Sequence, residues 1–375
     1  MPYPLVSVVT VVRNACSSGR AELLKQSLDS VAKQDYPHIE HLVIDGASTD
    51  GTMDLLRPYE DSGRIVLVSE PDSGIYDAMN KGIAKVRGKY VAFLNSDDYW
   101  KDPRGVSSSV DLLESTGAAF SYAPSIWLGE NDGYLATNIP QIGAFYVMMP
   151  FCHQTMFTRA DKLREYGGFD DKTFRSVADY DLICRMLMAG ERPVYNPLNF
   201  TVFRMGGFNN ANEEQNRLRE HENRVMRQRV FGGLMPPEQL AELSTQAPLS
   251  SIFTKALEMQ VHPSVALQME RCIKHEDLLR DTFGLVANVY KDEALAGSVP
   301  EAIEGGDYIE TKPVVRTTKV LLFGFLPVLI LRTAPSRVVV KLFGLLPLLK
   351  VRKAETRRSY LLFGCIPVLT VRSKK

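Results

Sequence analysis

The first hundred residues alternate between short apolar runs and longer amphipathic segments. The apolar runs are rich in β-branched residues, which favours buried strands, and they lie at residues 5–12, 38–45, 64–69 and 89–94. The segments between them place apolar side chains at helical spacing, at residues 22–33, 49–59 and 74–87. This alternation predicts an α/β fold in which βαβ units build a Rossmann-like, mostly parallel sheet flanked by helices.

Polar and acidic residues gather where each of these strands ends. They are Arg13 with Asn14, and the segments 45–52 (DGASTDGT), 70–74 (EPDSG) and 95–98 (NSDD). Right-handed crossovers place the loops after parallel strands along one edge of the sheet, where open α/β sheets bind their ligands. A single such loop is ordinarily a turn or a helix cap, but four at equivalent positions indicate a ligand site.

Two of these loops carry carboxylates with specific chemical uses. Asp45 lies at a strand tip, where its side chain can accept hydrogen bonds from a base or a ribose. The adjacent carboxylates of Asp97 and Asp98 repel one another unless a cation or hydrogen-bond donors compensate. A site with few protein oxygen ligands leaves room for phosphate oxygens, and such a site suits Mg²⁺ or Mn²⁺. The alternative is that these two residues only cap a helix. The chain has neither G-x-G-x-x-G nor GxxxxGK[ST], which argues against a dinucleotide fold and a P-loop.

Three titratable residues further along the chain are also candidates. His153 follows a hydrophobic run and is either a structural residue or a contact for a phosphate or the metal. Asp179 and Asp181 lie in the opening turn of a predicted helix. The helix dipole alone favours acidic residues there, so the pattern fits a helix end as well as a functional site.

Taken together, these segments resemble the family-two nucleotide-sugar glycosyltransferases, which have the GT-A fold. The resemblance covers about residues 5–205 and rests on VSVVTVV, IDGASTDGT, SEPDSGIYDAMNKGI, FLNSDD, the HQ pair at 153–154, and GGFD followed by ADYDLICRM. The order and spacing of these elements match the family. The resemblance implies an inverting transfer from a nucleoside-diphosphate sugar, with UDP favoured, that depends on Mn²⁺ or Mg²⁺.

The resemblance also implies roles for individual residues. Contacts to the nucleotide sugar are implied for six of them, namely Arg13, Asp45, Asp72, Asn80, Asn95 and Asp97. Asp97, with Asp98 beside it, matches the DxD element that binds the divalent ion. Asp179 matches the general base, and Asp181 is the second choice for that role.

The chain departs from the family pattern at three positions. Asn95 replaces the first aspartate of the DxD element, Ala178 replaces the glutamate before the base, and Arg13 stands where a tyrosine is common. The first two departures leave open a nucleotide-sugar-binding protein without turnover. A nucleotidyltransferase is a further alternative, but residues 11–20 (VVRNACSSGR) match its Gly-rich, basic phosphate loop poorly.

Length, composition and charge divide the chain into parts. Its 375 residues allow two or three domains, since a domain has about 150 residues. With 45% hydrophobic and 23% charged residues, it is neither wholly disordered nor a polytopic membrane protein. Its 44 basic and 44 acidic residues cancel, yet the end of the chain is strongly basic. We expect a GT-A catalytic domain at 1–211, a helical segment at 212–311 that begins with a solvated charged helix (212–230), and a basic tail at 312–375.

The tail repeats every 20 residues, with an LFGxxP core at residues 322–327, 342–347 and 362–367. Each apolar unit is too short to span a bilayer. The units can lie among lipid headgroups, with their basic flanks drawn to anionic lipid, or pair as three hairpins in a small sheet. We favour the membrane surface. Nucleic acid is not expected as a partner, because the aromatic residues lie mostly inside apolar runs.

The cysteine pattern and the amino terminus bear on the compartment. Five scattered cysteines without a CxxC predict reduced thiols, and the first residues lack the basic region of a signal peptide. We therefore expect a cytoplasmic enzyme that is peripheral on the inner face of the cell membrane. Its expected acceptor is a glycan or a lipid-linked glycan in cell-surface polysaccharide or lipopolysaccharide synthesis.

Overall fold

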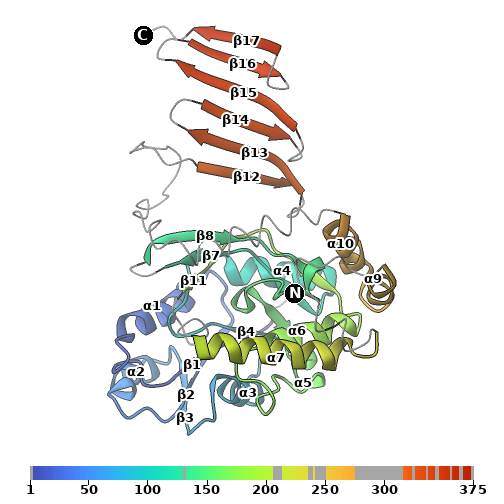
Figure 1. Ribbon diagram of the computed structural model, residues 1–375. Coiled ribbons are helices and arrows are strands. Elements are labelled where there is room, and N and C mark those ends of the chain that lie inside the picture. The colour runs from blue at the N-terminus through green and yellow to red at the C-terminus, as the bar shows by residue number, and fades with distance from the viewer. Residues whose placement is uncertain are drawn as a thin grey trace. The chain divides into compact units, whose positions relative to one another are not determined.

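The computed structural model describes residues 3–129, 132–205, 213–234, 240 and 251–274, together with six strands between residues 316 and 372. The chain folds as two compact units, Met1–Val299 and Pro300–Lys375. Each unit is described by itself (Figure 1). The first unit carries every candidate site residue named above.

The first unit is built on a seven-stranded sheet with the strand order β10-β6-β9-β4-β1-β2-β3. Its strands are β1 (Val6–Val12), β2 (Ile39–Asp45), β3 (Val66–Ser69), β4 (Tyr90–Phe93), β6 (Phe120–Tyr122), β9 (Phe157–Arg159) and β10 (Pro193–Tyr195). Strands β1 to β4 run parallel, as do β6 and β10, whereas β9 is antiparallel to both β4 and β6. The mostly parallel sheet expected from the sequence is confirmed.

A second, four-stranded sheet has the order β5-β11-β7-β8. Its strands are β5 (Tyr99–Trp100), β7 (Ser125–Leu128), β8 (Tyr134–Asn138) and β11 (Thr201–Arg204). Strand β5 follows the segment 95–98 directly and pairs antiparallel with β11. This pairing brings the end of β11 beside the acidic loop, although more than a hundred residues separate them in the sequence.

Helices and single turns connect and cover these sheets. They are α1 (Ala21–Ala32), α2 (Thr52–Asp61), α3 (Ile75–Lys85), α4 (Gly105–Thr116), η2 (Ile142–Ala144), η3 (His153–Thr155), α5 (Ala160–Glu165), α6 (Ala178–Met188), α7 (Glu213–Phe231), α9 (Ser251–Glu258) and α10 (Pro263–Lys274). The three helices expected in the first hundred residues form, with ends that differ from the expectation by a few residues. Helix–strand alternation therefore follows the hydrophobic pattern.

The core lies on both faces of the main sheet, because side chains alternate along each strand. Val9 packs with Met79 of α3 in the larger core cluster, whereas Val8 packs with Val106 of α4 in another. Helix α3 approaches β1 closely at Gly82, where a Cβ atom would lie 2.6 Å from a methyl carbon of Val9. Residue 82 therefore has to be a glycine for α3 to pack this closely on β1.

Helix α7 corrects the expectation of a solvated helix at 212–230. Glu222, Met226 and Phe231 are buried, and the helix packs against α6 (Figure 1). The remaining faces of α7 are charged, which hides the narrow buried stripe in the sequence. The helix is therefore part of the structure that supports α6.

The second unit contains a six-stranded antiparallel sheet in which the strands follow their order in the chain. They are β12 (Arg316–Leu322), β13 (Leu326–Ala334), β14 (Arg337–Leu342), β15 (Leu346–Ala354), β16 (Arg357–Leu362) and β17 (Ile366–Arg372). Register shifts recur in alternate pairs, at Val320/Leu321, Val340/Lys341 and Tyr360/Leu361. The small sheet that the sequence left as the alternative is thus formed, and membrane association stays a proposal.

Two further observations bear on the sequence expectations. Within the described parts of the chain, no helix is both long and apolar enough to cross a membrane. Four cysteines in these parts, Cys16, Cys152, Cys184 and Cys272, are free thiols.

Candidate active site

The loop after β2 is organised around Asp45. This carboxylate is fully buried and accepts hydrogen bonds from the backbone N–H of Ser48 (3.0 Å), from the Ser48 hydroxyl (2.5 Å) and from the Ser69 hydroxyl (2.7 Å). Asn14 donates its backbone N–H to the Ser48 hydroxyl and accepts from the N–H of Thr49. Asp45 therefore orders the loop, and the expected contact between Asp45 and a ribose or base stays a prediction.

Arg13 and Asp72 meet above the same loop. The Arg13 guanidinium lies 3.6 Å from Asp72, and its side chain is 60% exposed whereas that of Asp72 is 7% exposed. A Cβ atom on Gly46 would lie 2.1 Å from an Asp72 oxygen and 3.1 Å from Cδ of Arg13, so the loop fits only because residue 46 has no side chain. The structure thus brings two predicted nucleotide contacts together, with an exposed guanidinium plane available to a base.

Asn80 is hydrogen-bonded to the loop that precedes α6. Its side-chain amide oxygen accepts from the backbone N–H of Phe169 (2.9 Å), and its amide nitrogen donates to the Phe169 carbonyl (2.7 Å) and to Asp171 (3.1 Å). Asn80 on α3 therefore fixes the loop that precedes α6. The predicted contact between Asn80 and the nucleotide sugar is untested, and its observed partners all belong to this loop.

The acidic loop after β4 divides its two carboxylates between different environments. Asp98 is buried, and its oxygens accept from the Gln154 amide (2.5 Å) and the backbone N–H of Arg204 (2.6 Å). Burial and then the neighbouring charge of Asp97 raise the pKa of Asp98 well above its ordinary value. The Asp97 side chain is 14% exposed and lies 3.1 Å from Arg20. Asp97 is therefore the more accessible of the two.

The oxygen atoms of this loop fit a hard divalent cation that takes most of its ligands from substrate and water. Asp97 offers a carboxylate, and Oδ1 of Asn95 is buried without a hydrogen-bond partner among the described residues. Each Asp98 oxygen accepts one bond and keeps a second lone pair, so its predicted ligand role stays a proposal. No three acidic, histidine or cysteine side chains in the described ranges cluster into an all-protein metal cage. Mg²⁺ and Mn²⁺ accept such a sparse set of protein oxygens.

Arg204 fastens the acidic loop and was not identified from the sequence. Its guanidinium donates to the Asp97 carbonyl (2.6 Å), to Gln26 (2.7 Å) and to Asp132 (2.6 Å), and it stacks over the Tyr99 ring at 5.0 Å. The side chain is only 8% exposed. The one signal for this role in the sequence was that an arginine ends the apolar segment TVFR. A guanidinium that is buried with such a segment needs hydrogen-bond partners.

Asp179 lies in a dense hydrogen-bond network at the start of α6. Its Oδ1 accepts from the Tyr76 hydroxyl (2.8 Å) and from the backbone N–H of Tyr180 (2.9 Å), and Nδ1 of His153 lies 3.1 Å from its Oδ2. Burial acts to raise the pKa of Asp179, but the bonds from His153 and Tyr76 outweigh it and hold the pKa below its ordinary value. The carboxylate is therefore ionised at neutral pH.

Asp181, the second choice for the base, lies in a different setting. Its side chain is fully buried and forms ion pairs with Arg185 of α6 (2.8 Å) and with Arg229 of α7. Arg185 also donates to the carbonyls of Tyr166 (2.6 Å) and Gly168 (2.9 Å). Asp181 thus fastens α6 to α7 and to the preceding turn, which favours Asp179 for the chemical role.

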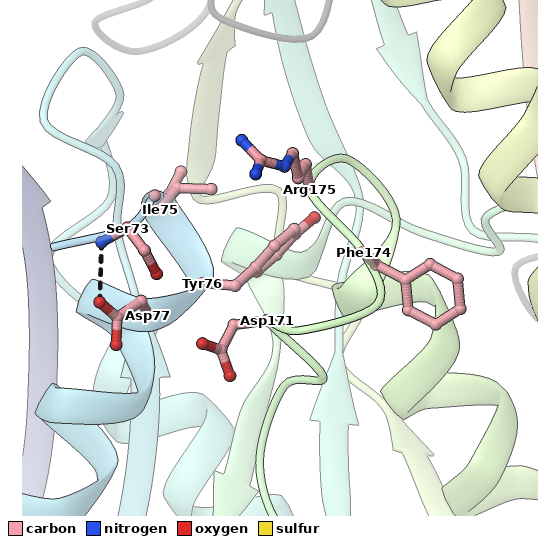
Figure 2. A pocket seen from close by; sticks show the side chains of 8 residues that line it. Ser73, Ile75, Tyr76, Asp77, Asp171, Phe174 and Arg175 are labelled. Carbon is pink, nitrogen blue, oxygen red and sulfur yellow. Dashed lines mark hydrogen bonds between the residues drawn. The ribbon is translucent and has the colours of Figure 1, made fainter.

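A pocket lies between the start of α3 and the loop before α6. It is lined by Ser73, Gly74, Ile75, Tyr76, Asp77, Asp171, Phe174 and Arg175. Figure 2 shows the Tyr76 ring and the exposed Arg175 side chain on one side of it, with the backbone of Ser73 bonded to Asp77 on the other. The hydroxyl of Tyr76 also bonds to Asp179, so one residue that lines the pocket contacts the base candidate.

The short turn η3 joins the two chemical halves of the site. His153 contacts Asp179, while Gln154 accepts from the backbone N–H of Asn95 (2.8 Å) and donates to Asp98. Two consecutive residues therefore link the acidic loop to the carboxylate on α6. The sequence indicated the HQ pair only through a family resemblance.

Comparison with known proteins identifies the family to which the chain is similar. The family described as Glycosyl transferase family 2 matches residues 7–166. A glycosyltransferase of Mycobacterium tuberculosis that is itself uncharacterized is 32% identical over 194 residues, which are 50% of this chain and 71% of that protein. TuaG of Bacillus subtilis, named for teichuronic acid biosynthesis, is 38% identical over 121 residues. That match covers 32% of this chain, and it spans less than half of TuaG, 46% of its length.

A solved structure shares the fold. The S. aureus protein TarS, crystallised in complex with UDP-GlcNAc, matches with a TM-score of 0.50 at 15% identity. The match covers 76% of this chain and 89% of that chain. The GT-A fold expected from the sequence is thereby confirmed.

Proposed function

The chain belongs to glycosyl transferase family 2 and is a glycosyltransferase, and on that premise we propose that it carries out an inverting, metal-dependent transfer of a sugar from a nucleoside-diphosphate sugar. The observation that carries this proposal is the link through η3 between the acidic loop and Asp179. A displacement needs charge compensation at the leaving diphosphate and a proton acceptor at the incoming hydroxyl. The linked residues offer both kinds of group.

Support for the nucleotide comes from the loops after β1, β2 and β3. Arg13 presents an exposed guanidinium beside the nearly buried Asp72, and Gly46 leaves room for both. A guanidinium stacks on an aromatic base, and a carboxylate accepts hydrogen bonds from base or ribose. UDP is the proposed nucleotide, in keeping with the complex of TarS with UDP-GlcNAc.

Support for the metal comes from the oxygen atoms of the acidic loop. Asp97 would hold Mn²⁺ or Mg²⁺, with Asn95 and Asp98 as the nearby oxygen donors of the same loop. The bound cation would compensate the negative charge that develops on the diphosphate. Arg204 and Gln154 hold the loop in place through its carbonyl, amide and carboxylate groups. The protein's part is therefore to present one accessible carboxylate on a firmly anchored loop.

Support for the acceptor side comes from Asp179 and its surroundings. The carboxylate is ionised and accepts a hydrogen bond from Tyr76, which lines the pocket between α3 and the loop before α6. Among the described residues, the side-chain partners of Asp179 are Tyr76 and His153, neither of them a lysine or an arginine. We place proton removal from the acceptor hydroxyl here. A single displacement without a covalent intermediate inverts the anomeric centre.

A donor screen tests the proposal. The full-length protein is incubated with UDP-GlcNAc, UDP-glucose, UDP-galactose and GDP-mannose in the presence of Mn²⁺, and nucleotide release is followed with and without EDTA. We expect one donor to be turned over, slowly with water and faster with membrane extract as the acceptor source. EDTA abolishes this turnover. Failure to turn over any donor, with or without extract, would contradict the proposal.

Two substitutions distinguish the role of the acidic loop from the role of Asp179. Asp97→Ala is expected to abolish transfer and to weaken donor binding, because the charge at the diphosphate is then uncompensated. Asp179→Asn is expected to abolish transfer with donor binding unchanged. Equal loss of donor binding in both variants would contradict this division.

For the acceptor and the location, we propose a glycan or lipid-linked glycan of a surface polysaccharide or lipopolysaccharide, glycosylated at the cytoplasmic face of the membrane. The relative TuaG, named for teichuronic acid biosynthesis, supports a polysaccharide acceptor. The 14 basic residues against one acidic residue in the tail support attraction to anionic lipid. Co-sedimentation of the full chain with anionic vesicles, but not with neutral ones, is the expected result; equal recovery with both would contradict it.

A further inference from the structure

Arg20 is the residue directly before α1, at the end of the loop that follows β1. Its backbone N–H donates to the carbonyl of Ala15 (2.8 Å), and its carbonyl accepts from the N–H of Leu24 in the first turn of α1 (2.9 Å). The guanidinium reaches the acidic loop, where Nη1 lies 3.1 Å from Oδ2 of Asp97, and the side chain is 38% exposed. A long, partly exposed side chain on a fixed backbone can change its partner without any movement of the helix.

The fold sets the distance between α1 and the acidic loop. The Ser27 hydroxyl of α1 donates to the carbonyl of Asn95 (3.0 Å), and the Ser30 hydroxyl accepts from the backbone N–H of Trp100 (3.1 Å). These two hydrogen bonds fasten the helix to both ends of the segment 95–100. The guanidinium of Arg20 is therefore kept within reach of the acidic loop by the packing of α1.

The carboxylate that Arg20 contacts is also the one that the proposed metal site needs. Asp97 is the accessible carboxylate of the loop, whereas both oxygens of Asp98 accept hydrogen bonds, from Gln154 and from the backbone of Arg204. Two cations beside one carboxylate repel each other, so Arg20 and a divalent ion compete for Asp97 unless an anion joins them. A diphosphate is such an anion, and its oxygens match the planar fork of a guanidinium.

We propose that Arg20 exchanges its partner when the donor binds: it pairs with Asp97 beforehand and with the diphosphate afterwards, which leaves Asp97 to the divalent ion. This inference rests on the proposed function and assigns a residue to one part of it, the binding of the diphosphate. The guanidinium thus opposes the binding of metal alone and supports the binding of nucleotide together with metal. Metal and nucleotide therefore bind cooperatively, each raising the affinity of the other by the same factor.

The test measures binding to the full-length protein by calorimetric titration, so it does not depend on turnover. Mn²⁺ is titrated with and without UDP, and UDP is titrated in the presence of saturating Mn²⁺. Arg20→Gln removes the charge, and Arg20→Lys keeps the charge without the planar fork. Arg57→Gln is the matched control, because Arg57 is exposed on α2 and its ion pair with Asp54 lies within that helix.

We expect Arg20→Gln to bind Mn²⁺ alone about tenfold more tightly than the wild type, and to bind UDP with saturating Mn²⁺ about tenfold more weakly. The cooperativity between the two ligands then falls, since one residue no longer couples them. Arg20→Lys is expected to bind Mn²⁺ alone as weakly as the wild type and to recover part of the affinity for UDP. We expect Arg57→Gln to behave as the wild type in every titration.

Two results would overturn the inference. One is wild-type affinity for both ligands in Arg20→Gln. The other is tighter binding of Mn²⁺ with unchanged binding of UDP, because Arg20 would then only neutralise the acidic loop. A wild type that binds neither Mn²⁺ nor UDP would instead refute the proposed function on which the inference rests.

Discussion

At the scale of the residue, the absence of a side chain at Gly46 decides how the nucleotide end of the site is built. Asp72 and Arg13 approach the backbone there so closely that a methyl group would displace both. The two side chains belong to loops after different strands, so their meeting depends on this one position. Replacing Gly46 by alanine, which adds a single methyl group, is therefore expected to change the binding of the donor.

Gly46→Ala is expected to weaken binding of UDP by about tenfold or more, since displacement of a charge-assisted contact costs at least ~1.5 kcal/mol. Because the clash falls on the ends of side chains, we expect the melting temperature to change little. Gly233→Ala is the control, because a Cβ atom there meets no neighbour within 4 Å. Calorimetric titration with UDP measures the effect. Wild-type affinity in Gly46→Ala would show that Arg13 and Asp72 do not contact the nucleotide.

His41 gives the stability of the protein a pH dependence. The side chain is buried on β2 with Nε2 2.9 Å from the Thr10 hydroxyl, and burial, followed by the charge of Arg64, lowers the pKa of His41 to about 3. The unfolded chain binds a proton at this residue below pH ~6.5, whereas the folded chain does not. The stabilising effect of His41 is therefore complete above pH ~6.5 and is lost as the pH falls toward the folded pKa.

We expect the free energy of unfolding to fall through this residue by about 1.4 kcal/mol per pH unit between pH ~6 and ~4. His41→Gln keeps an amide for Thr10 and removes the titration, so its stability should vary less with pH over that range. Urea unfolding at a series of pH values measures both proteins. Parallel curves would mean that His41 is protonated in the folded chain as readily as in the unfolded one.

At the scale of the element, α7 supports the segment that leads into α6 through a buried carboxylate, in addition to the ion pair of Arg229 with Asp181. Glu222 accepts from the backbone N–H groups of Arg175 (2.9 Å) and Ser176 (2.8 Å), which precede α6 in the chain. These two residues lead directly into the helix that carries Asp179. The position of the catalytic carboxylate thus depends on a helix that the sequence indicated as solvated.

Glu222→Gln is expected to lower the free energy of unfolding by about 2 kcal/mol, because an amide NH₂ would then face a backbone N–H in a buried site. We also expect slower transfer with unchanged UDP binding, since α6 and Asp179 shift while the nucleotide loops do not. Glu220→Gln is the control, because Glu220 is exposed on the same helix. Urea unfolding measures the change in stability, and the transfer assay measures the change in rate. If Glu222→Gln and Glu220→Gln were equally stable, Glu222 would not stabilise the segment before α6.

At the scale of the whole molecule, the chain separates into a unit that carries the site residues and a unit that carries the repeats. The division falls between Val299 and Pro300. The hydrogen bonds described above for the site all join residues of the first unit. We therefore expect that donor turnover and attachment to a membrane surface can be separated by dividing the chain.

A chain that ends at residue 299 is expected to hydrolyse the donor at the rate of the full protein and to lose binding to anionic vesicles. The basic residues of the tail supply the attraction, at about 1 kcal/mol each near an anionic surface, so added salt should release the full chain as well. Donor hydrolysis and vesicle co-sedimentation measure the two properties. Retained vesicle binding in the shortened chain would place attachment in the first unit.

The sequence predicted the parts of the site that depend on local pattern. Apolar runs located the strands, and the polar residues after them located Asp45, Asp72 and Asp97 at one edge of the sheet. It did not predict the residues that act across long separations. Arg204 bonds to Asp98 over 106 positions, and Gln154 bonds to it over 56. Pairing of this kind depends on how β11 and η3 pack, which no local pattern encodes.

The register of the tail sheet bears on how the number of repeats can change during evolution. The irregular pairing recurs at Val320/Leu321, Val340/Lys341 and Tyr360/Leu361, which is once for each repeat of the sequence. Removing or inserting one whole repeat would therefore take out or add two strands and leave every other pairing in register. Recombination between copies of the repeat would produce such changes, and we expect the sheet to tolerate them because the remaining strands keep their pairing. We therefore expect the number of repeats to vary more readily among related chains than the unit that carries the site residues.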